Sequence, residues 1–315
     1  MVSVVVPTAG RPHLVVRAVR SALEQTLREL EVVVVLDGPD ADTTAGLGRI
    51  DDPRLRTIEL PRRLGVGDAR NAAVDAARSP WVALLDDDDE WLPDKIALQL
   101  AAAHASTWRE PIVSCRFLSR TEHGDVVLPR RRPVHGEPIS EYLFCQRGLL
   151  GGEGLVLPST LLAPTSLLRR VRFRHRRLPH EGSDWLLRAL RDDGVGVEFV
   201  RTREPLVVFH GEGTRERMSN ASDWRASLAW AADNADLLSP RAHAAFVLIR
   251  ASLEARRGRE WRAFWPLVAA AFRHGRPTAV GLLAHALIWT VPPRTRFTMA
   301  DRLVRWMPGP SPATR

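Results

Sequence analysis

Short apolar runs alternate with helical patterns over the first 100 residues, and this alternation constrains the fold more than any other feature of the chain. The runs cover residues 2–6, 32–36, 55–60 and 81–85. Residues 32–36 form a continuous apolar run, which is typical of a strand buried on both faces, and the run at 55–60 is weaker. Apolar residues at helical spacing lie between and after the four runs. The pattern predicts an α/β fold with a doubly wound, mostly parallel sheet and flanking helices.

The rest of the chain divides into a mixed region and a helical region. Residues 107–205 combine strand and helix patterns, and residues 112–118 are predicted as one strand. After residue 222 only helical periodicity remains, with helices expected at 223–237, 240–256, 259–272 and 278–291. We therefore expect one domain over residues 1–222, with halves at 1–105 and 106–222, followed by a basic α-helical region over residues 223–315.

The basic excess of the chain lies in its last third. The sequence has 45 Lys and Arg residues against 37 Asp and Glu residues, which gives a formal net charge of +8. Residues 206–315 hold 16 basic and 8 acidic side chains, so residues 1–205 are neutral overall. No nucleic-acid-binding motif accompanies the basic charge, and we expect no nucleic-acid partner.

The cysteines and the N-terminus bear on the cellular compartment. Cys115 and Cys145 are too few for a disulfide framework or a multi-cysteine zinc site. Residues 1–3 lead directly into an apolar run, without the basic segment that opens a secretory signal. We therefore expect a cytoplasmic protein in a reducing compartment.

The strongest chemical signal is a run of five acidic residues at 86–90, directly after the apolar run that ends at Leu85. Ligands bind beyond the carboxyl ends of the strands in open α/β sheets. Like charges there repel one another, and a bound cation lowers that cost. Carboxylates suit Mg²⁺ or Mn²⁺, whose shell substrate phosphates can complete. The alternative interpretation is a solvated acidic turn before the helix near Pro93.

Four segments that occur in order carry a resemblance to a known family. They are Val-Ser-Val-Val-Val-Pro-Thr at 2–8, Leu-Asp-Gly at 36–38, Gly-Asp-Ala-Arg-Asn at 67–71 and Leu-Asp-Asp-Asp-Asp-Glu-Trp-Leu-Pro-Asp-Lys at 85–95. Together they resemble the nucleotide-sugar half of the family 2 glycosyltransferases, which have the GT-A fold. The resemblance covers about residues 1–210 and is strongest over the first 100. It implies an inverting transfer of a sugar from a nucleoside diphosphate sugar to an acceptor hydroxyl.

The resemblance also implies roles for individual residues. Those that would contact the donor are Pro7, Thr8, Arg11, Asp37, Arg70, Asp86 and Asp87, with Thr8 and Asp37 at the nucleobase and Arg70 at the base or ribose. Those that would contact the Mn²⁺ or Mg²⁺ cofactor are Asp88, Asp86 and His210. A carboxylate can accept the ring N–H of uracil or of another base with a donor there. A UDP-sugar is favoured as donor, while the identity of the base stays open because Leu36 stands where family members often carry a further acid. Structural alternatives are a helix cap for Thr8, a turn for Asp37, a surface position for Arg70 and a structural role for His210.

The general base is expected in the stretch at 178–188. Family members commonly carry a Glu-Asp pair before a Trp-containing helix, and here Gly182 stands where the second acid is usual. Asp184 and Glu181 are the main candidates, with His180 a distant third, and Asp184 is slightly favoured because it directly precedes the helical run. Asp184 as a helix cap is the structural alternative.

Two other functional classes stay open. The broken acidic pair is compatible with a catalytically weak protein that binds nucleotide sugars or glycans. A sugar nucleotidyltransferase is less favoured, because residues 7–11 do not form the glycine-rich phosphate loop that such enzymes place after the first strand. For a transferase, the acceptor would be a glycan, a lipid-linked molecule or a small molecule.

The helical region suggests a partner of its own. The uncharged stretch 277–293 is shorter than a membrane-spanning helix requires. The basic residues that follow it lie close to Trp289 and Trp306, and they are Arg294, Arg296, Arg302 and Arg305. Basic charge beside apolar and tryptophan residues favours a peripheral contact with an anionic surface at the inner membrane face. The alternative is a helical subdomain with a solvated arginine face.

Overall fold

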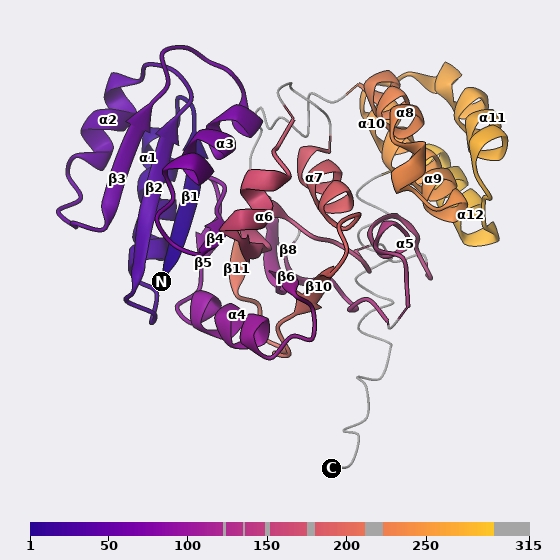
Figure 1. Ribbon diagram of the computed structural model, residues 1–315. Helices are drawn as coiled ribbons and strands as arrows, with labels where there is room; N and C mark the ends of the chain where they lie inside the picture. Colours follow the sequence, from indigo (N-terminus) through magenta and orange to yellow (C-terminus); the bar gives the residue numbers. More distant parts are fainter. Residues whose placement is uncertain (122–123, 135, 149–151, 175–179, 212–222, 293–315) are drawn as a thin grey trace. The chain divides into compact units, whose positions relative to one another are not determined.

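The computed structural model describes residues 1–121, 124–134, 136–148, 152–174, 180–211 and 223–292 (Figure 1). Its contacts divide the chain into two compact units. One unit comprises Met1–Pro129 and Val156–Thr214, and we call it the sheet unit. The other comprises Arg130–Leu155 and Arg215–Arg315, and we call it the helical unit. Residues 130–155, expected in the second half of the first domain, thus belong with the C-terminal helices.

The sheet unit is built on a seven-stranded sheet of order β10-β6-β9-β4-β1-β2-β3. The strands are β1 (Val2–Thr8), β2 (Leu30–Leu36), β3 (Leu55–Glu59), β4 (Trp81–Leu84), β6 (Glu110–Ser114), β9 (Leu162–Pro164) and β10 (Val195–Phe199). All neighbouring pairs are parallel except those of β9, which is antiparallel to β4 and β6. The four expected runs are β1 to β4, and every residue of β1 and β2 is buried. The predicted mostly parallel α/β fold is confirmed.

Helices flank this sheet. They are α1 (Pro12–Leu23), α2 (Ala41–Leu47), α3 (Val66–Ala76), α4 (Lys95–His104), α6 (Thr165–Arg170) and α7 (Glu181–Ala189), with a 3-10 turn η1 (Pro158–Thr160). Pro12 opens α1, where its missing N–H costs no hydrogen bond. The apolar stripe of α1 is buried, and α3 packs on β1 and β2. The chain therefore turns from strand to helix repeatedly at one edge of the sheet.

A second, four-stranded sheet has the order β5-β11-β7-β8. Its strands are β5 (Glu90–Trp91), β7 (Phe117–Thr121), β8 (Gly124–Leu128) and β11 (Val207–His210). The single strand predicted at 112–118 is wrong, because β6 and β7 are separate strands in different sheets. Pairing of β11 with β5 sets Val208 opposite Glu90 and so brings the end of β11 to the acidic run.

The helical unit contains short helices around an aromatic core. They are α5 (Ile139–Phe144), α8 (Trp224–Asp233), η3 (Ala235–Leu237), α9 (Pro240–Ala245), the π-helical η4 (Phe246–Ala251), α10 (Ser252–Arg257), η5 (Trp261–Ala263), α11 (Phe264–His274) and α12 (Ala279–Thr290). Phe246 lies 5.0 Å, between ring centroids, from both Phe144 and Trp230. Ser239 donates to Glu141 over 2.7 Å and ties α9 to α5. These contacts explain why residues 130–155 join this unit. Among the described residues, no helix is both long enough and apolar enough to cross a membrane.

Candidate active site

The carboxyl ends of β1, β2 and β4 meet at one edge of the large sheet. The parallel register sets Thr8 beside Leu36 and Val5 beside Leu84. Asp37 directly follows β2, and the acidic run at 86–90 follows β4. The topology thus brings together the polar residues that the sequence places after separate strands, as expected for a parallel sheet.

Asp87 joins the end of β1 to the acidic run. The hydroxyl of Thr8 donates to Asp87 Oδ2 over 2.7 Å, and Arg11 Nη1 donates to Oδ1 over 3.0 Å. Asp87 is only 6% exposed. Burial raises its pKa to about 6, while Arg11 and the Thr8 hydroxyl act in the opposite direction. Thr8 is therefore bonded across the strand ends, and the residue that caps α1 is Arg11 rather than Thr8.

Arg70 lies between two carboxylates from distant parts of the sequence. Its Nη2 donates to Asp86 Oδ1 over 2.6 Å and its Nη1 to Glu181 Oε1 over 3.1 Å. The guanidinium is 5.3 Å from the centre of the Phe173 ring and the residue is 4% exposed, so a surface position is excluded. Burial raises the pKa of Glu181, whereas Arg70 lowers it. Arg70 thus links the end of β4 to the first residue of α7.

Hydrogen bonds from Ser159 and Trp91 fix the conformation of the acidic run. Ser159 Oγ accepts the backbone N–H of Asp86 over 3.0 Å and donates to Asp89 Oδ2 over 2.5 Å. The indole N–H of Trp91 donates to the Ser159 carbonyl over 2.9 Å. Lys95 Nζ lies 3.8 Å from the centre of the Trp91 ring and is fully buried. Because Asp87 and Asp89 are also buried, the run is not a solvated acidic turn.

Asp37 binds the backbone of the loop that precedes α3. Its Oδ1 accepts the backbone N–H of Leu64 over 2.6 Å, and its Oδ2 accepts that of Gly65 over 3.0 Å. Gly65 has a φ of 110°, which favours glycine, and α3 begins at the next residue. Asp37 therefore fixes the loop that leads to Arg70. Each carboxylate oxygen keeps further acceptor capacity for a donor group of a ligand.

Asp86 and Asp88 are the carboxylates best placed to hold a metal ion. The described residues contain no group of three or more His, Cys, Asp or Glu side chains arranged as metal ligands. Mg²⁺ needs only one or two carboxylates when phosphates and water complete its shell. Asp86 pairs with Arg70, and Asp88 Oδ2 lies 3.6 Å from Arg11 Nη1. The Asp86 and Asp88 carboxylates fit a divalent ion whose remaining ligands come from a diphosphate and water.

His210 lies beside Glu90, the last residue of the acidic run. Its Nε2 is 2.5 Å from Glu90 Oε1, and Arg17 Nε is 3.3 Å from the same oxygen. Arg17 Nη2 also donates to the carbonyl of Asp88 over 2.7 Å. The residue expected as a metal ligand is thus linked to the acidic run through Glu90.

Glu181 and Asp184 occupy different surroundings. Asp184 is 1% exposed and its carboxylate pairs with Arg188 Nε at 2.9 Å and with Arg174 Nη1 at 3.0 Å. The residue at the cap position of α7 is His180, so Asp184 is not the cap. Glu181, one helical turn earlier, joins Asp86 through Arg70. The structure therefore brings Glu181 rather than Asp184 to the acidic run.

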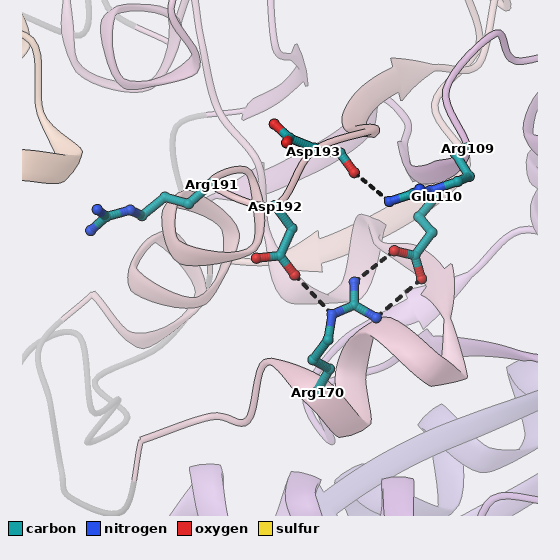
Figure 2. Close-up of a pocket in the computed structure, with 6 residues that line it drawn as sticks. All are labelled: Arg109, Glu110, Arg170, Arg191, Asp192 and Asp193. Atoms are coloured by element: carbon teal, nitrogen blue, oxygen red, sulfur yellow. Dashed lines mark hydrogen bonds and ion pairs between the residues drawn. The ribbon is translucent and has the colours of Figure 1, made fainter.

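A surface hollow lies at the opposite edge of the sheet, where β6 begins and the chain enters β10. Figure 2 shows Arg170 between Glu110 and Asp192, with nitrogen–oxygen distances of 2.6 and 2.8 Å. Arg109 donates to the backbone carbonyl of Asp193 over 2.7 Å. Because Arg170 pairs with both Glu110 and Asp192, this hollow is a weaker candidate for chemistry than the carboxyl edge.

Ser159, Trp91 and Lys95 are site-supporting residues that the sequence did not identify in this role. Trp91 and Lys95 lie within the segment that carries the family resemblance, but only their burial shows what they do. Ser159 contacts the acidic run from a position 70 residues further along the chain. A single serine in a 3-10 turn gives no sequence signal of such a contact.

Comparison with known proteins agrees with this geometry. Residues 3–132 match the family described as Glycosyl transferase family 2. The succinoglycan biosynthesis protein ExoO of Rhizobium meliloti is 43% identical over 105 residues, which cover 33% of this chain and 30% of ExoO. The amylovoran biosynthesis glycosyltransferase AmsB of Erwinia amylovora is 26% identical over 219 residues, which cover 66% of this chain and 69% of AmsB. The match thus spans under a third of ExoO and about two thirds of AmsB.

A solved structure extends the likeness of the fold. TarS 1-349 of S. aureus in complex with UDP-GlcNAc is 18% identical, with a TM-score of 0.59 over 96% of this chain and 91% of that chain. At this identity the likeness concerns the fold, and it agrees with a GT-A architecture followed by C-terminal helices. Residues 3–132 thus match glycosyl transferase family 2 in sequence, and the fold of the chain is similar to that of TarS.

Proposed function

We propose that the protein is an inverting glycosyltransferase of polysaccharide biosynthesis that moves a sugar from a UDP-sugar to an acceptor hydroxyl. The observation that carries this proposal is the junction of Asp86, Arg70 and Glu181 beside Asp88. This junction brings residues that could bind a metal ion and diphosphate close to a carboxylate that could accept a proton, at one edge of a family 2 domain. The names of ExoO and AmsB, which refer to succinoglycan and amylovoran biosynthesis, and the UDP-GlcNAc bound by TarS support the substrate class.

In this proposal the donor site is the carboxyl edge of β1, β2 and β4. Asp37 accepts the ring N–H of uracil with the acceptor capacity left beside Leu64 and Gly65. Asp88 and Asp86 would hold Mg²⁺ or Mn²⁺, which when bound neutralises the charge of the departing diphosphate. Arg11 Nη1 lies 3.6 Å from Asp88 Oδ2, so the guanidinium would remain beside that carboxylate when a metal ion binds to it.

We assign the general base to Glu181. An inverting transfer needs a group that takes the proton from the acceptor hydroxyl as its oxygen attacks the anomeric carbon opposite the leaving diphosphate. Burial raises the pKa of Glu181 toward the range in which a base works near neutral pH. Arg70 fixes the orientation of the carboxylate. Asp184, which the sequence favoured, is the second candidate, and its two arginine partners suit it to holding α7 in position.

The acceptor is a glycan or a lipid-linked saccharide in this proposal, and the place of action is the inner membrane face. A protein that binds the donor without turnover is the second candidate function. Gly182, at the usual position of an acid, favours it.

Release of UDP from a panel of UDP-sugars, with Mn²⁺ present, tests the proposed function. We expect turnover by the full chain and a loss of at least about 100-fold in Asp88→Ala, since electrostatic stabilisation of a leaving group is worth that much. Asp51→Asn, which changes an exposed acid of the same unit, is the matched control and should retain activity. Tight binding of UDP-sugars without turnover would support the binding protein. Full activity of Asp88→Ala would exclude the metal site.

A further inference from the structure

The helix pair α11 and α12 exposes an unusual amount of apolar surface. Nine large apolar side chains are exposed among the described residues, and four of them lie between residues 261 and 283. They are Trp265 at 74% exposure, Phe272 at 59%, Trp261 at 55% and Leu283 at 49%. Single exposed apolar residues are ordinary, but a concentration of aromatic ones marks an interaction surface.

The helix α11 is apolar on two faces. Its inner face buries Leu267 and Ala271, which are one turn apart. Its outer face presents Trp265, Ala269 and Phe272, which follow the spacing of one side of a helix and are all exposed. A surface helix ordinarily has polar residues on its outer side. With 11 residues, α11 is too short to span a bilayer, so the outer face suits a contact in the plane of an interface.

From Trp261 onward, the charged residues on and beside α11 have one sign. Residues 261–292 contain no Asp or Glu, and they include Arg262, Arg273 and Arg276. All three arginines are exposed. Arg256 lies 4.3 Å from the centre of the Trp261 ring, which adds a further cation beside the exposed aromatic residues. A partner that fits this face must supply both an apolar phase and negative charge.

We propose that the outer face of α11, with Trp261 and Leu283, docks on the surface of an anionic lipid bilayer. An anionic bilayer offers headgroup charge to Arg273 and Arg276 and an apolar interior to Trp265 and Phe272. A second copy meeting the same face would bring these arginines against one another. Residues 293–315 of the chain carry five arginines and one acid, so their charge also disfavours that face. This proposal concerns a binding surface and does not depend on the transfer reaction.

The surface differs from the one expected from sequence. Trp289 is 4% exposed and contacts Phe264 and Trp261 within the unit, so it is unavailable to a membrane. The basic residues Arg294, Arg296, Arg302 and Arg305, and also Trp306, lie outside the described residues. The docking surface inferred from the structure precedes them in the chain and consists of exposed residues of η5, α11 and α12.

Co-sedimentation of the full chain with lipid vesicles tests the proposal. One set of vesicles is pure phosphatidylcholine, and the other is an equimolar mixture with phosphatidylglycerol. We expect binding to the mixed vesicles that weakens at high salt, and at least about tenfold weaker binding to the neutral ones. The double variant Trp265→Ser/Phe272→Ser should lose about 100-fold in partition, roughly tenfold for each aromatic side chain.

Matched variants separate the contributions. Arg273→Gln/Arg276→Gln should remove most of the preference for phosphatidylglycerol. Trp108→Ser, which removes an exposed tryptophan from the sheet unit, should bind as the unchanged protein does. UDP release by Trp265→Ser/Phe272→Ser with a soluble acceptor should equal that of the unchanged protein. Failure of the proposed function would therefore appear in the UDP-release assay and would leave the sedimentation result unaffected.

Three results would overturn the proposal. One is sedimentation that is the same with and without mixed vesicles. Another is equal loss of binding in Trp108→Ser and in the double variant. The third is a lipid-free dimer in analytical ultracentrifugation that Trp265→Ser/Phe272→Ser dissociates, because that would assign the face to a second copy of the chain.

Discussion

Two regions of the molecule, the carboxyl edge of the large sheet and the helix α11, hold their charged residues in opposite ways. In the sheet unit, Arg70 is buried between Asp86 and Glu181, and Asp87 is buried against Arg11. In the helical unit, Arg273 and Arg276 are exposed in a stretch without acidic residues. Buried charges cost free energy unless they are paired in a fixed geometry, whereas exposed ones cost little.

The difference separates two kinds of function. Paired charges at the carboxyl edge of the sheet hold a defined arrangement, which is what the binding and transfer of a charged donor require. Exposed charge of one sign beside exposed aromatic residues is what the proposed contact with an anionic bilayer requires. The net charge of +8 is therefore a property of one region, since residues 1–205 are neutral overall.

The largest effect is expected at Glu181. Glu181→Gln keeps the size of the side chain and removes the proton acceptor, so kcat should fall by about 100- to 10,000-fold. Asp184→Asn should change kcat far less and chiefly lower the free energy of unfolding, because Asp184 is buried against Arg188 and Arg174. Steady-state kinetics and urea denaturation of both variants measure the contrast. If Asp184→Asn were inactive and Glu181→Gln active, Asp184 rather than Glu181 would be the general base.

A smaller effect is expected from Lys95, the one lysine of the chain, which the sheet unit buries completely. Burial lowers its pKa to about 7. The unfolded chain keeps the usual lysine pKa of about 10.4 and so binds more protons than the folded chain between about pH 7 and 10. Stability should therefore rise with pH in this window, by at most about 1.4 kcal/mol per pH unit from this group.

Lys95→Met isolates that contribution. Its free energy of unfolding, measured in urea at neutral and at alkaline pH, should vary less with pH than that of the unchanged protein. Leu98→Met, a partly exposed position on the same helix, is the control and should keep the original slope. An unchanged slope in Lys95→Met would mean that Lys95 is protonated in the folded protein throughout the window.

The core of the sheet was predictable because its physical signal is local. A run such as Val32–Leu36 is apolar at every position, and a strand buried on both faces requires this. The division of residues 112–118 was not predictable, since Cys115 and Arg116 give no strong turn signal between β6 and β7. The assignment of residues 130–155 also failed, because contacts such as that of Glu141 with Ser239 join positions 98 residues apart.

The sequence predicted many of the residues of the candidate site, but it predicted less well which of these side chains contact one another. Strand ends and the family resemblance identify Thr8, Asp37 and Asp86, which the sheet does bring to one edge. The sequence slightly favoured Asp184 over Glu181 and could not show that Glu181 meets Arg70, whereas Asp184 meets Arg174 and Arg188. The helical unit shows the same limit, because the sequence does not reveal that α12 buries Trp289 whereas α11 exposes Trp265.

Calorimetric titration with UDP shows whether the carboxyl edge of β1, β2 and β4 is a metal-assisted nucleotide site. UDP is titrated into the full chain with and without Mn²⁺, and then into Asp88→Asn under both conditions. We expect binding that Mn²⁺ strengthens at least about tenfold in the unchanged protein, with no such gain in Asp88→Asn. UDP binding that is equal in both proteins and indifferent to Mn²⁺ would contradict such a site.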